Sequence, residues 1–482
     1  MSEMKKSYDL EPLLKAAFAT ESQQIEGFAL SGRCGIRISR QHTIQVGQEE
    51  SSKICHRVPR IFRRNPSSNE DCYNPLVVSI GPYHHNDDPN HELAEMQSLK
   101  NEMVQQFANE SGKTREVLYS KVEELAVSAK KCYDERSTKD LGDKAFTEMM
   151  LLDGCFILQF IFCFLHDFQN LKLSNRVLAY FVKRDLFLLE NQIPYEVLKS
   201  LMSLRFGDAE GKKLMEDFMD DVRGLPRDKS RDKENGKGLD CRFWSWRPAP
   251  KMNNQPGEIP QVPGEIPQPV HLLDFFHNRF MGGSRGQENL SLKGDGQWSS
   301  YRSVMELKSV GIHFMPSKTD MYTDILYKST MRGGTVTLPR IVIDDSTKSL
   351  LLNLMAHEAC PGPAEGFGVT SYVYFMDSLI DHPEDVKELR KKGILSNVLG
   401  SDQEVADLFN EISSFMVFDP NAYGNVKSSI EKHCKNVIKK WAAEWLNDHF
   451  SSPWTFLAFF GAIFALVLTF IQTYKTLYPG NQ

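Results

Sequence analysis

Apolar residues recur every three or four positions along several stretches of this chain, a spacing that predicts amphipathic helices with one buried face. The clearest pattern runs through residues 93–107 and continues through residues 117–125. Ser401 and Glu404 form a capping-box signature just ahead of another apolar stripe. Pro383, which is followed by two acidic residues, marks a further helix start. We therefore expect a mainly helical domain.

Alternation of apolar and polar residues, the pattern of a half-buried strand, occurs in only two short stretches. They are residues 312–315 and residues 336–343, and a turn at Gly333 and Gly334 is expected ahead of the second. Pro339 interrupts the second stretch and favours an edge strand or a bulge, because proline cannot donate a ladder hydrogen bond. The expected fold class is mainly α with a small β element.

Two runs of apolar residues differ in length and setting. Residues 154–165 lie between charged segments and are too short to span a bilayer, so we expect a core helix there. Residues 454–471 contain no charge, and as a helix they would span roughly 27 Å, close to the roughly 30 Å of a hydrocarbon core. Trp454 and Tyr474 suit the two membrane interfaces. A transmembrane helix over residues 454–474 is expected, with a buried core helix as the alternative.

Charged residues on either side of this span predict its orientation. Lys435, Lys439 and Lys440 precede the span, whereas Lys475 alone follows it. Because positive residues stay on the cytoplasmic side, the large N-terminal part should be cytosolic. The start of the chain lacks the apolar core of a secretory signal. We expect a tail-anchored, single-pass protein, in the plasma membrane rather than an endomembrane.

Changes in composition divide the chain into six parts. The expected order is a variable lead-in (1–52), a helical first half of one domain (53–223), an insertion (224–270), a second half with short strands (271–450), the transmembrane helix (454–474) and a short tail (475–482). The insertion is first highly charged and then contains PGEIPQ twice. Since proline-rich repeats cannot bury a core, we expect it to be disordered. A docking motif for a proline-reading domain is the alternative.

The overall composition is that of a folded protein. Of the 482 residues, 41% are hydrophobic and 25% are charged, which is ordinary for a globular chain. The net charge of -6 argues against a surface built for nucleic acid. The nine cysteines are scattered and form no C-x-x-C pair, so the sequence indicates neither a zinc site nor a disulfide framework. Reduced thiols in a cytosolic setting fit best.

The chain also carries a series of short motifs. They are YNP (73–75), VSIGPYHH (78–85), MMLLDGCFIL (149–158), DLFLLENQIP (185–194), FMDSLID (375–381) and EVADLFN (404–410). In this order they resemble the plant domain-of-unknown-function 247 family, also called uncharacterised protein family 0481, from about residue 54 onward. The resemblance implies a land-plant source, attachment to a membrane and no established biochemical activity. For some grass members of the family it implies an association with self-incompatibility.

Two positions depart from the family's pattern. Gln97 stands where the family usually has a glutamate, and Asn86 stands where it usually has a glycine. Because Gln97 is neutral, it can neither form an ion pair with Lys100 nor serve as a catalytic carboxylate. This departure weakens an enzymatic interpretation.

A loop rich in histidine and carboxylate side chains is the strongest candidate for a metal site, because both kinds of side chain ligate zinc and iron. Its members are His84, His85, Asp87, Asp88, His91 and Glu92. Their spacing fits no H-E-x-x-H motif or facial triad, and Pro82 and Pro89 mark a turn-rich loop. We interpret the segment as a polar loop ahead of the 93–107 helix, with a metal site as the alternative.

Two other motifs fall short of a known type of site. His357 and Glu358 are not followed by the second histidine of a zinc-protease motif. A nucleophile pair of His357 with Cys360 would need spatial proximity and an orienting third group. Glycine-rich residues 282–286 lack the Gly-Lys-Ser/Thr ending of a phosphate-binding loop, so we interpret them as an ordinary loop.

Polar residues beside a strongly apolar stretch indicate a buried hydrogen-bond network. Glu190, Asn191 and Gln192 directly follow residues 186–189, which are all apolar. Buried polar groups must find hydrogen-bond partners. We predict a network that closes a helix end before Pro194, with the floor of a binding pocket as the alternative.

Two basic groups could contact anionic lipid headgroups near the anchor. They are Lys387, Arg390, Lys391 and Lys392 in one group, and Arg57, Arg60, Arg63 and Arg64 in the other. Solvated faces are the preferred interpretation of such runs. Asn109 and Asn289 match the glycosylation pattern but would not meet the glycosylation machinery in a cytosolic domain.

No residue set reaches the standard of an active site, so we assign no catalytic, cofactor-binding or metal-binding residues and expect no cofactor. The function expected is that of a non-enzymatic interaction or signalling component at the cytosolic face of a membrane. Its partners would be the lipid bilayer, through residues 454–474, and other proteins, with no nucleic acid and no small-molecule substrate. The alternatives are a membrane-localised enzyme or metal protein using residues 84–92, and a self-incompatibility or cell-recognition determinant implied by the resemblance.

Overall fold

The computed structural model describes most of the chain between Cys55 and Leu477. The described residues are 55–63, 70–85, 92–171, 173, 176–224, 268–281, 302–319, 321–330, 333–361, 367–413, 422–449 and 453–477. Some sequence predictions concern residues outside this set, namely residues 1–52, the proline-rich repeats, Arg64, Asp87, Asp88, His91, residues 282–286 and Asn289. They stay predictions.

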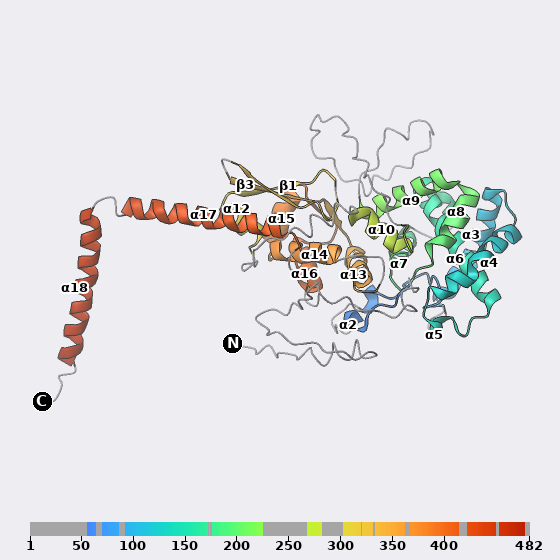
Figure 1. The fold of residues 1–482 in the computed structure, drawn as a ribbon, viewed down its shortest axis with the longest axis horizontal. Helices are drawn as coiled ribbons and strands as arrows, with labels where there is room; N and C mark the ends of the chain where they lie inside the picture. The colour runs from blue at the N-terminus through green and yellow to red at the C-terminus, as the bar shows by residue number, and fades with distance from the viewer. Residues whose placement is uncertain are drawn as a thin grey trace.

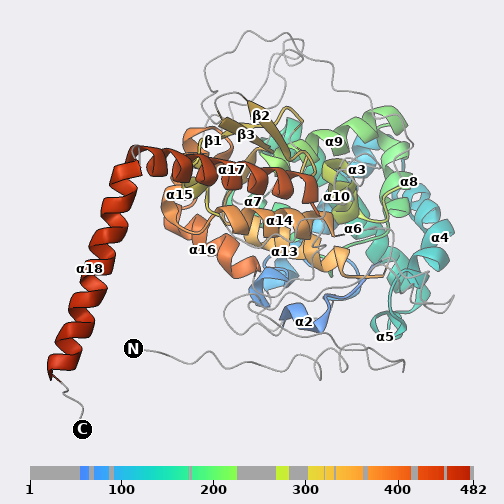
Figure 2. The same cartoon turned by 60° about the vertical axis from the view of Figure 1, so that its left-hand side comes forward.

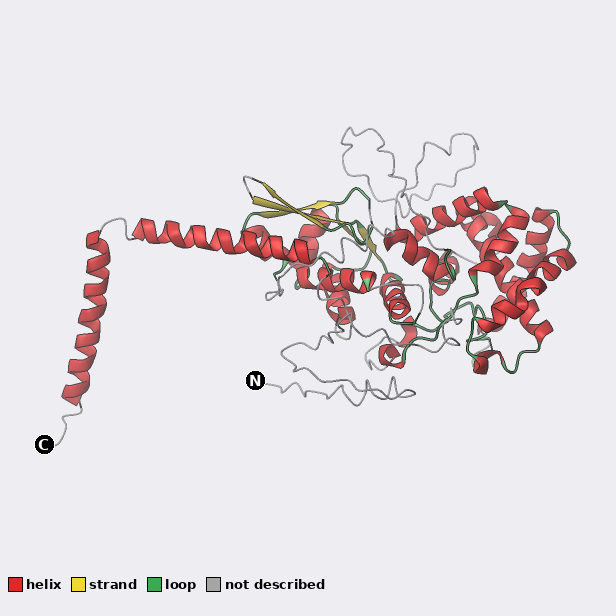
Figure 3. Cartoon of the chain, in the orientation of Figure 1, coloured by secondary structure: helices red, strands yellow, loops and turns green. Residues whose placement is uncertain are grey.

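Helices make up most of the described structure, as Figure 3 shows, which confirms the mainly α fold class. Those of the first half are α2 (Arg60–Arg63), α3 (Glu92–Ser111), α4 (Arg115–Lys131), α5 (Glu135–Thr138), α6 (Asp143–His166), α7 (Arg176–Asp185), α8 (Tyr195–Arg205) and α9 (Asp208–Arg223), with 3-10 turns at Glu70–Cys72 and Phe168–Leu171. The helices predicted at 93–107 and 117–125 are confirmed as α3 and α4.

Helix α6 is the centre of the first half. Helices α3, α4, α8 and α9 all pack against it (Figure 1). Every side chain from Met149 to Ile161 is buried, including the polar Asp153 and Gln159. A helix that is apolar on all sides is stable in water only when other elements surround it. The prediction of a core helix at 154–165 is therefore confirmed.

The second half contains the remaining helices of the body. They are α10 (Leu272–Met281), α12 (Val304–Ser309), α13 (Thr347–Glu358), α14 (Gly368–Leu379), α15 (Pro383–Lys391), α16 (Asp402–Ile412) and α17 (Gly424–His449). Both predicted helix starts are confirmed. The Ser401 hydroxyl accepts a hydrogen bond from Glu404 N at 3.2 Å, and Pro383 is the first residue of α15 behind a capping box at His382.

Two small sheets supply the β element. In the first, the order is β1 (Ile312–Pro316), β3 (Gly333–Leu338) and β2 (Leu326–Thr330), with β1 parallel and β2 antiparallel to β3. In the second, β4 (Ile341–Ile343) runs parallel to β5 (Leu395–Asn397). The strand predicted at 312–315 is confirmed. Pro339 divides the predicted 336–343 stretch into β3 and β4, which belong to different sheets.

The turn predicted at Gly333 and Gly334 is wrong, because these residues are the first two of β3 and pair with β2. Gly333 has φ 149°, and a Cβ there would lie 2.1 Å from the carbonyl oxygen of Gly311. Glycine is thus needed for the close approach of β3 to Gly311, whose carbonyl accepts a hydrogen bond from Gly334 N at 3.1 Å. Strand β2 escaped prediction because it is exposed along almost its whole length and shows no alternation.

The buried apolar side chains of both halves form one core. Phe187 of the first half contacts Phe276 of α10, with ring centroids 5.5 Å apart. On either side of the insertion the chain is fixed in this core. Gly224 packs closely against β4, and the carbonyl of Val270 accepts a hydrogen bond from Tyr195 N at 2.8 Å.

Helix α18 (Pro453–Leu477) stands apart from the other helices in both views of the molecule (Figures 1 and 2). Its side chains from 461 to 474 are all exposed. By length and apolarity, the helix among the described residues that could cross a membrane is α6, and 78% of its apolar window is buried. The described apolar part of α18, Gly461–Tyr474, is shorter. The expected transmembrane helix at 454–474 is not supported by this criterion and stands as a proposal.

Candidate functional site

Three polar side chains in the segment between α7 and α8 are almost fully buried. Glu190, Asn191 and Gln192 expose 3%, 1% and 2% of their surface. The Gln192 side chain donates to two carbonyl groups of its own segment, both at 2.8 Å, and accepts a hydrogen bond from Leu273 N of α10 at 3.0 Å. The predicted buried network is confirmed, and it also reaches across to the second half of the chain.

The same region holds residues 76–81, an irregular stretch with bends near the start of the body. The backbone amides of residues 76, 77 and 78 all donate to Asp185 Oδ2, at 2.9, 2.8 and 3.1 Å. The amides at positions 80 and 81 donate to Asn191 at 2.6 Å and to Asp153 at 2.7 Å. Burial raises the pKa of Asp185, although these backbone donors oppose the effect. Side-chain oxygens here accept the hydrogen bonds of backbone amides that belong to no helix or sheet.

Lys100 of α3 completes this arrangement. Its side chain is 5% exposed, and its Nζ donates to Asp153 Oδ1 and to the carbonyl of Ser79, each at 2.5 Å. A buried ammonium group requires a carboxylate partner, because an unpaired charge is costly to bury. Sequence reasoning considered Gln97 as the neighbour of Lys100, but the partner is Asp153, from α6.

Of the predicted histidine–carboxylate loop, burial is described for two members: His84 is buried and His85 is exposed. His84 Nε2 lies 3.4 Å from Glu190 Oε2, and Arg63 lies 2.9 Å from the same oxygen. Burial alone would raise the pKa of Glu190, but the contacts with His84 and Arg63 hold it below its usual value. Among the described residues no three His, Cys, Asp or Glu side chains are placed to hold a metal ion. The metal alternative therefore gains no support from them.

A second buried cluster joins α10 to α13. It consists of His271, Asp274, His277, His357 and Glu358, none of which exposes more than 5% of its surface. His357 Nε2 lies 3.0 Å from Asp274 Oδ1, and His277 Nε2 lies 2.8 Å from Glu358 Oε1. The rings of His271 and His357 have centroids 4.9 Å apart. We call this set the α10–α13 cluster.

Glu358 extends the α10–α13 cluster to a third helix. Its carboxylate accepts hydrogen bonds from Val369 N at 2.7 Å and from Thr370 N at 2.9 Å, at the start of α14. A carboxylate is favoured there, because the first amides of a helix are unpaired and carry a partial positive charge. One side chain thus ties α10, α13 and α14 together.

Protonation differs sharply within the α10–α13 cluster. Burial, reinforced by the neighbouring His357, lowers the pKa of His271 to about 3, so His271 is neutral at physiological pH. Burial would lower the pKa of His277, but contact with Glu358 raises it. Burial would raise the pKa of Asp274, but the hydrogen bond from His357 brings it to about 2. Asp274 is therefore ionised beside a neutral His271.

The hypothetical nucleophile pair of His357 with Cys360 does not form. The hydrogen-bond partner of His357 is Asp274, and Cys360 Sγ donates to the carbonyl of Ala356 at 3.2 Å. Burial raises the pKa of the Cys360 thiol to about 12. A thiol that stays protonated is not an activated nucleophile.

Sequence reasoning missed the α10–α13 cluster. The available signal was the spacing of three between His271, Asp274 and His277, which places these side chains on one side of a helix. Their partners on α13 lie about eighty positions further along the chain. Periodicity within one helix carries no information about such a distant pairing.

Members of both predicted basic groups form ion pairs. Arg57 lies 3.1 Å from Asp134, and Arg390 lies 2.8 Å from Asp402. These pairs leave part of each basic side chain exposed, since Arg57 and Arg390 retain 53% and 50% of their side-chain surface. Arg57 and Arg390 are therefore solvated surface residues that take part in ion pairs.

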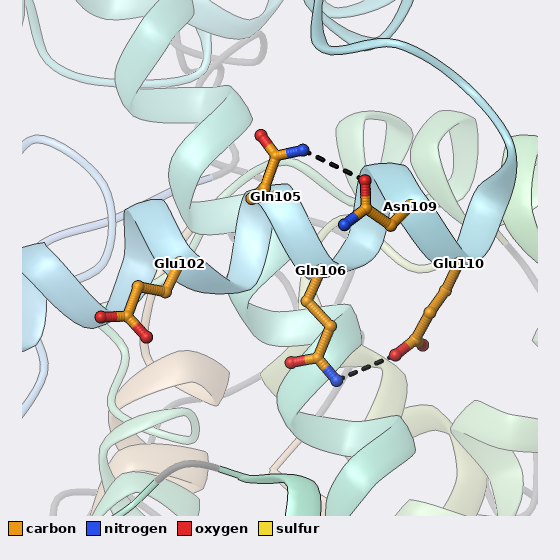
Figure 4. Close-up of a pocket in the computed structure, with 5 residues that line it drawn as sticks. All are labelled: Glu102, Gln105, Gln106, Asn109 and Glu110. Atoms are coloured by element: carbon orange, nitrogen blue, oxygen red, sulfur yellow. Dashed lines mark hydrogen bonds between the residues drawn. The ribbon is translucent and has the colours of Figure 1, made fainter.

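One open depression of about 420 Å³ lies on the surface of α3 (Figure 4). It is lined by Glu102, Gln105, Gln106, Asn109 and Glu110. Figure 4 shows that two of the lining pairs bond to each other, Gln105 to Asn109 at 3.1 Å and Gln106 to Glu110 at 2.8 Å. All five side chains come from one helix, α3, so the depression does not bring together groups from different elements.

Comparison with known proteins identifies relatives but no solved structure. A family model described as "Plant protein of unknown function" (DUF247) matches residues 55–468. The chain is 28% identical to "UPF0481 protein At3g47200" of Arabidopsis thaliana over 452 residues, 86% of this chain and 84% of that protein. It is 24% identical to "Putative UPF0481 protein At3g02645" of the same plant over 523 residues, 92% of this chain and 94% of that protein. No solved structure matches the chain.

Proposed function

This chain belongs to the DUF247 family of plant proteins, which has no established function, and we propose that it is a single-pass membrane protein that binds other proteins. Its helical body, the described residues between 55 and 436, would lie at the cytosolic face and catalyse no reaction. The observation that carries the proposal is the exposed apolar surface of α18.

Apolar side chains are exposed on every side of the part of α18 whose side chains the structure describes, residues 461–474. Phe464, Leu466 and Phe470 expose 65%, 70% and 73% of their surface, and Val467 and Leu468 expose 49% and 44%. Consecutive helical positions point about 100° apart, so positions 466, 467 and 468 cannot share one buried face. A helix apolar all round requires an apolar surrounding. For a helix that stands apart from the body, a lipid bilayer is that surrounding.

Helices α18 and α6 differ in what covers their apolar surface. Both helices are long and apolar, with 25 and 24 residues. The apolar surface of α6 is already covered by α3, α4, α8 and α9, whereas that of the described part of α18 is exposed. At about 1.5 Å per residue α18 measures about 37 Å, enough to cross a hydrocarbon core of about 30 Å.

The flanking charges support a cytosolic body. Lys435 is exposed near the middle of α17, and Lys439 and Lys440 follow it, whereas Lys475 alone lies beyond the apolar run. An excess of lysine on one side keeps that side in the cytosol. The plasma membrane is the location we favour.

We propose a binding role, not catalysis, because buried carboxylate and amide side chains that could take part in chemistry are instead bonded to the backbone of the body. Asp185, Asn191 and Asp153 hold backbone amides, and Glu358 caps α14. Such satisfied buried networks make a rigid body. A rigid body attached to a membrane is suited to present a fixed surface to partners.

Membrane extraction tests the anchor. We expect the full chain, expressed in plant cells, to stay in the pellet after alkaline carbonate washing, and external protease to spare its body in sealed cells. The double substitution Leu466→Lys and Phe470→Lys should release the chain, because each buried lysine opposes insertion by about 2.5 to 3.5 kcal/mol. Release of the unmodified chain by carbonate would refute the anchor.

A matched control separates insertion from general loss of apolar surface. Val127 of α4 is 72% exposed on the body, so Val127→Lys should leave membrane extraction unchanged. Proximity labelling with the full chain and with the Leu466→Lys, Phe470→Lys variant then tests the binding role. Partners captured equally by both forms would contradict a role that depends on the membrane.

A further inference from the structure

Arg223, the last residue of α9, is a buried cation without a counterion among the described residues. It exposes 5% of its surface, and its Nε and Nη2 atoms have no hydrogen-bond acceptor. Other buried arginines of this protein are paired: the side chain of Arg205 is 3% exposed beside Glu110, and that of Arg184 is 8% exposed beside Asp185. Arg223 therefore departs from the pattern of its own chain.

Aromatic residues surround the Arg223 guanidinium. Its central carbon lies 4.1 Å from the ring centroid of Tyr322 and 5.8 Å from that of Phe280. The Tyr372 ring lies against Tyr322, with centroids 4.7 Å apart. Its hydroxyl group is within hydrogen-bonding reach of Arg223, and both this contact and the charge of Arg223 oppose the rise that burial causes in the pKa of Tyr372. That hydroxyl is also buried without a hydrogen-bond acceptor.

These contacts leave the strongest donors of Arg223 unused. An aromatic face attracts a cation, but it offers no acceptor for an N–H group in the plane of the guanidinium. A buried charge and buried unpaired donors are both unfavourable. A ligand that brings negative charge and oxygen acceptors would correct both.

The unused atoms form the edge of the guanidinium that binds two oxygens side by side. Arg279, on the neighbouring α10, shows this use in the same molecule. Its Nε donates to Asp220 Oδ1 at 2.9 Å and its Nη2 donates to Asp220 Oδ2 at 2.8 Å. The same pair of atoms in Arg223 is buried and has no acceptor. The planar fork of arginine matches carboxylate and phosphate oxygens in this way.

We propose that Arg223 and Tyr372 form a buried binding site for a phosphate group. Two oxygens would accept hydrogen bonds from Arg223 Nε and Nη2, and a third would accept one from the Tyr372 hydroxyl. Three donors favour a tetrahedral oxyanion over a carboxylate, which has only two oxygens. The phosphate could be the free anion or part of a lipid headgroup. The site is independent of the role proposed for α18.

Thermal unfolding of the full chain in detergent tests the site. Replacing chloride by inorganic phosphate at equal ionic strength should raise Tm, because a ligand that binds only the folded state stabilises it. Arg223→Gln should abolish this rise. Arg279→Gln is the matched control and should keep it, since Asp220 already occupies that guanidinium.

Tyr372→Phe gives a second readout if Arg223→Gln fails to fold. It removes one donor, so Kd for phosphate by calorimetry should increase about tenfold. An unchanged Kd in this variant, or an unchanged Tm rise in Arg223→Gln, would overturn the site. Nanodiscs with and without phosphatidylinositol phosphate distinguish the two sources. If neither free phosphate nor this lipid raised the Tm of the unmodified chain, the site would also be overturned.

Discussion

Acid should destabilise the body through one buried histidine, His271. This side chain is fully buried beside α10, and its Nδ1 accepts a hydrogen bond from Asp274 N at 3.1 Å. Its pKa is about 3 in the folded chain, against an ordinary value of 6.5 that applies when the chain unfolds. Between these two pH values His271 is therefore neutral in the folded state and protonated in the unfolded state. The substitution His271→Asn removes this difference while keeping an acceptor for Asp274 N.

The sign and size of the effect follow from linkage. Because the folded pKa is depressed, the stability is complete above about pH 6.5 and is lost as pH falls toward 3. The loss amounts to about 1.4 kcal/mol per pH unit, or about 2 kcal/mol between pH 6.5 and pH 5. Asp274 does not contribute between pH 6.5 and pH 5, because its folded pKa of about 2 and its ordinary value of 3.8 both lie below this range. His277 has a raised pKa in the folded state, so its contribution to stability is complete below about pH 6.5 and is lost as pH rises above that value.

Urea unfolding of the full chain in detergent, followed by circular dichroism between about pH 7.5 and about pH 5, measures this loss. The unmodified chain should lose about 2 kcal/mol more than His271→Asn over the acidic part of the range. His313→Asn, at an exposed position on β1, controls for the removal of a histidine and should follow the unmodified chain. Parallel pH profiles for the unmodified chain and His271→Asn would refute the reasoning.

Three further substitutions have expected outcomes. Lys100→Met leaves Asp153 buried and unpaired and should cost about 3 to 5 kcal/mol of unfolding free energy, whereas Lys121→Met, from an exposed pair, should cost less than about 1 kcal/mol. Gly81→Ala should be more destabilising than Gly112→Ala by urea titration. Both glycines have positive φ, but only at Gly81 would a Cβ meet a backbone oxygen, that of Gln192 at 2.8 Å. Ser401→Ala removes the cap of α16 and should lower stability by about 1 kcal/mol, and an unchanged urea midpoint would contradict that cap.

Local pattern was sufficient for much of the fold. The apolar spacing around Met103 and Phe107 and the cap at Ser401 specify helices through contacts within a few residues, and α3 and α16 follow them. The run 154–165 was predicted as core because it is short and lies between charged segments, and its burial within α6 confirms this, although the whole 24-residue helix is long and apolar enough to cross a membrane. These features depend on neighbours in sequence.

Features that depend on distant residues were not predictable. Nothing near Asp185 indicates that it binds the amides of residues 76–78, more than a hundred positions earlier. The network at Glu190 was predictable from its composition, but its partners, including Val58 N, were not. The unpaired Arg223 was invisible for the same reason, since the lack of a counterion is a property of the packed structure.

The fixed positions of Gly224 and Val270 have a consequence for how this protein can vary. Both residues are held in place by contacts with the same core, so the two ends of the chain between them have fixed positions. Closing a flexible loop becomes harder only with the logarithm of its length, at about 0.6 kcal/mol for each doubling. Natural lineages could therefore lengthen, shorten or rewrite residues 225–267 freely, while the two fastening points should change little.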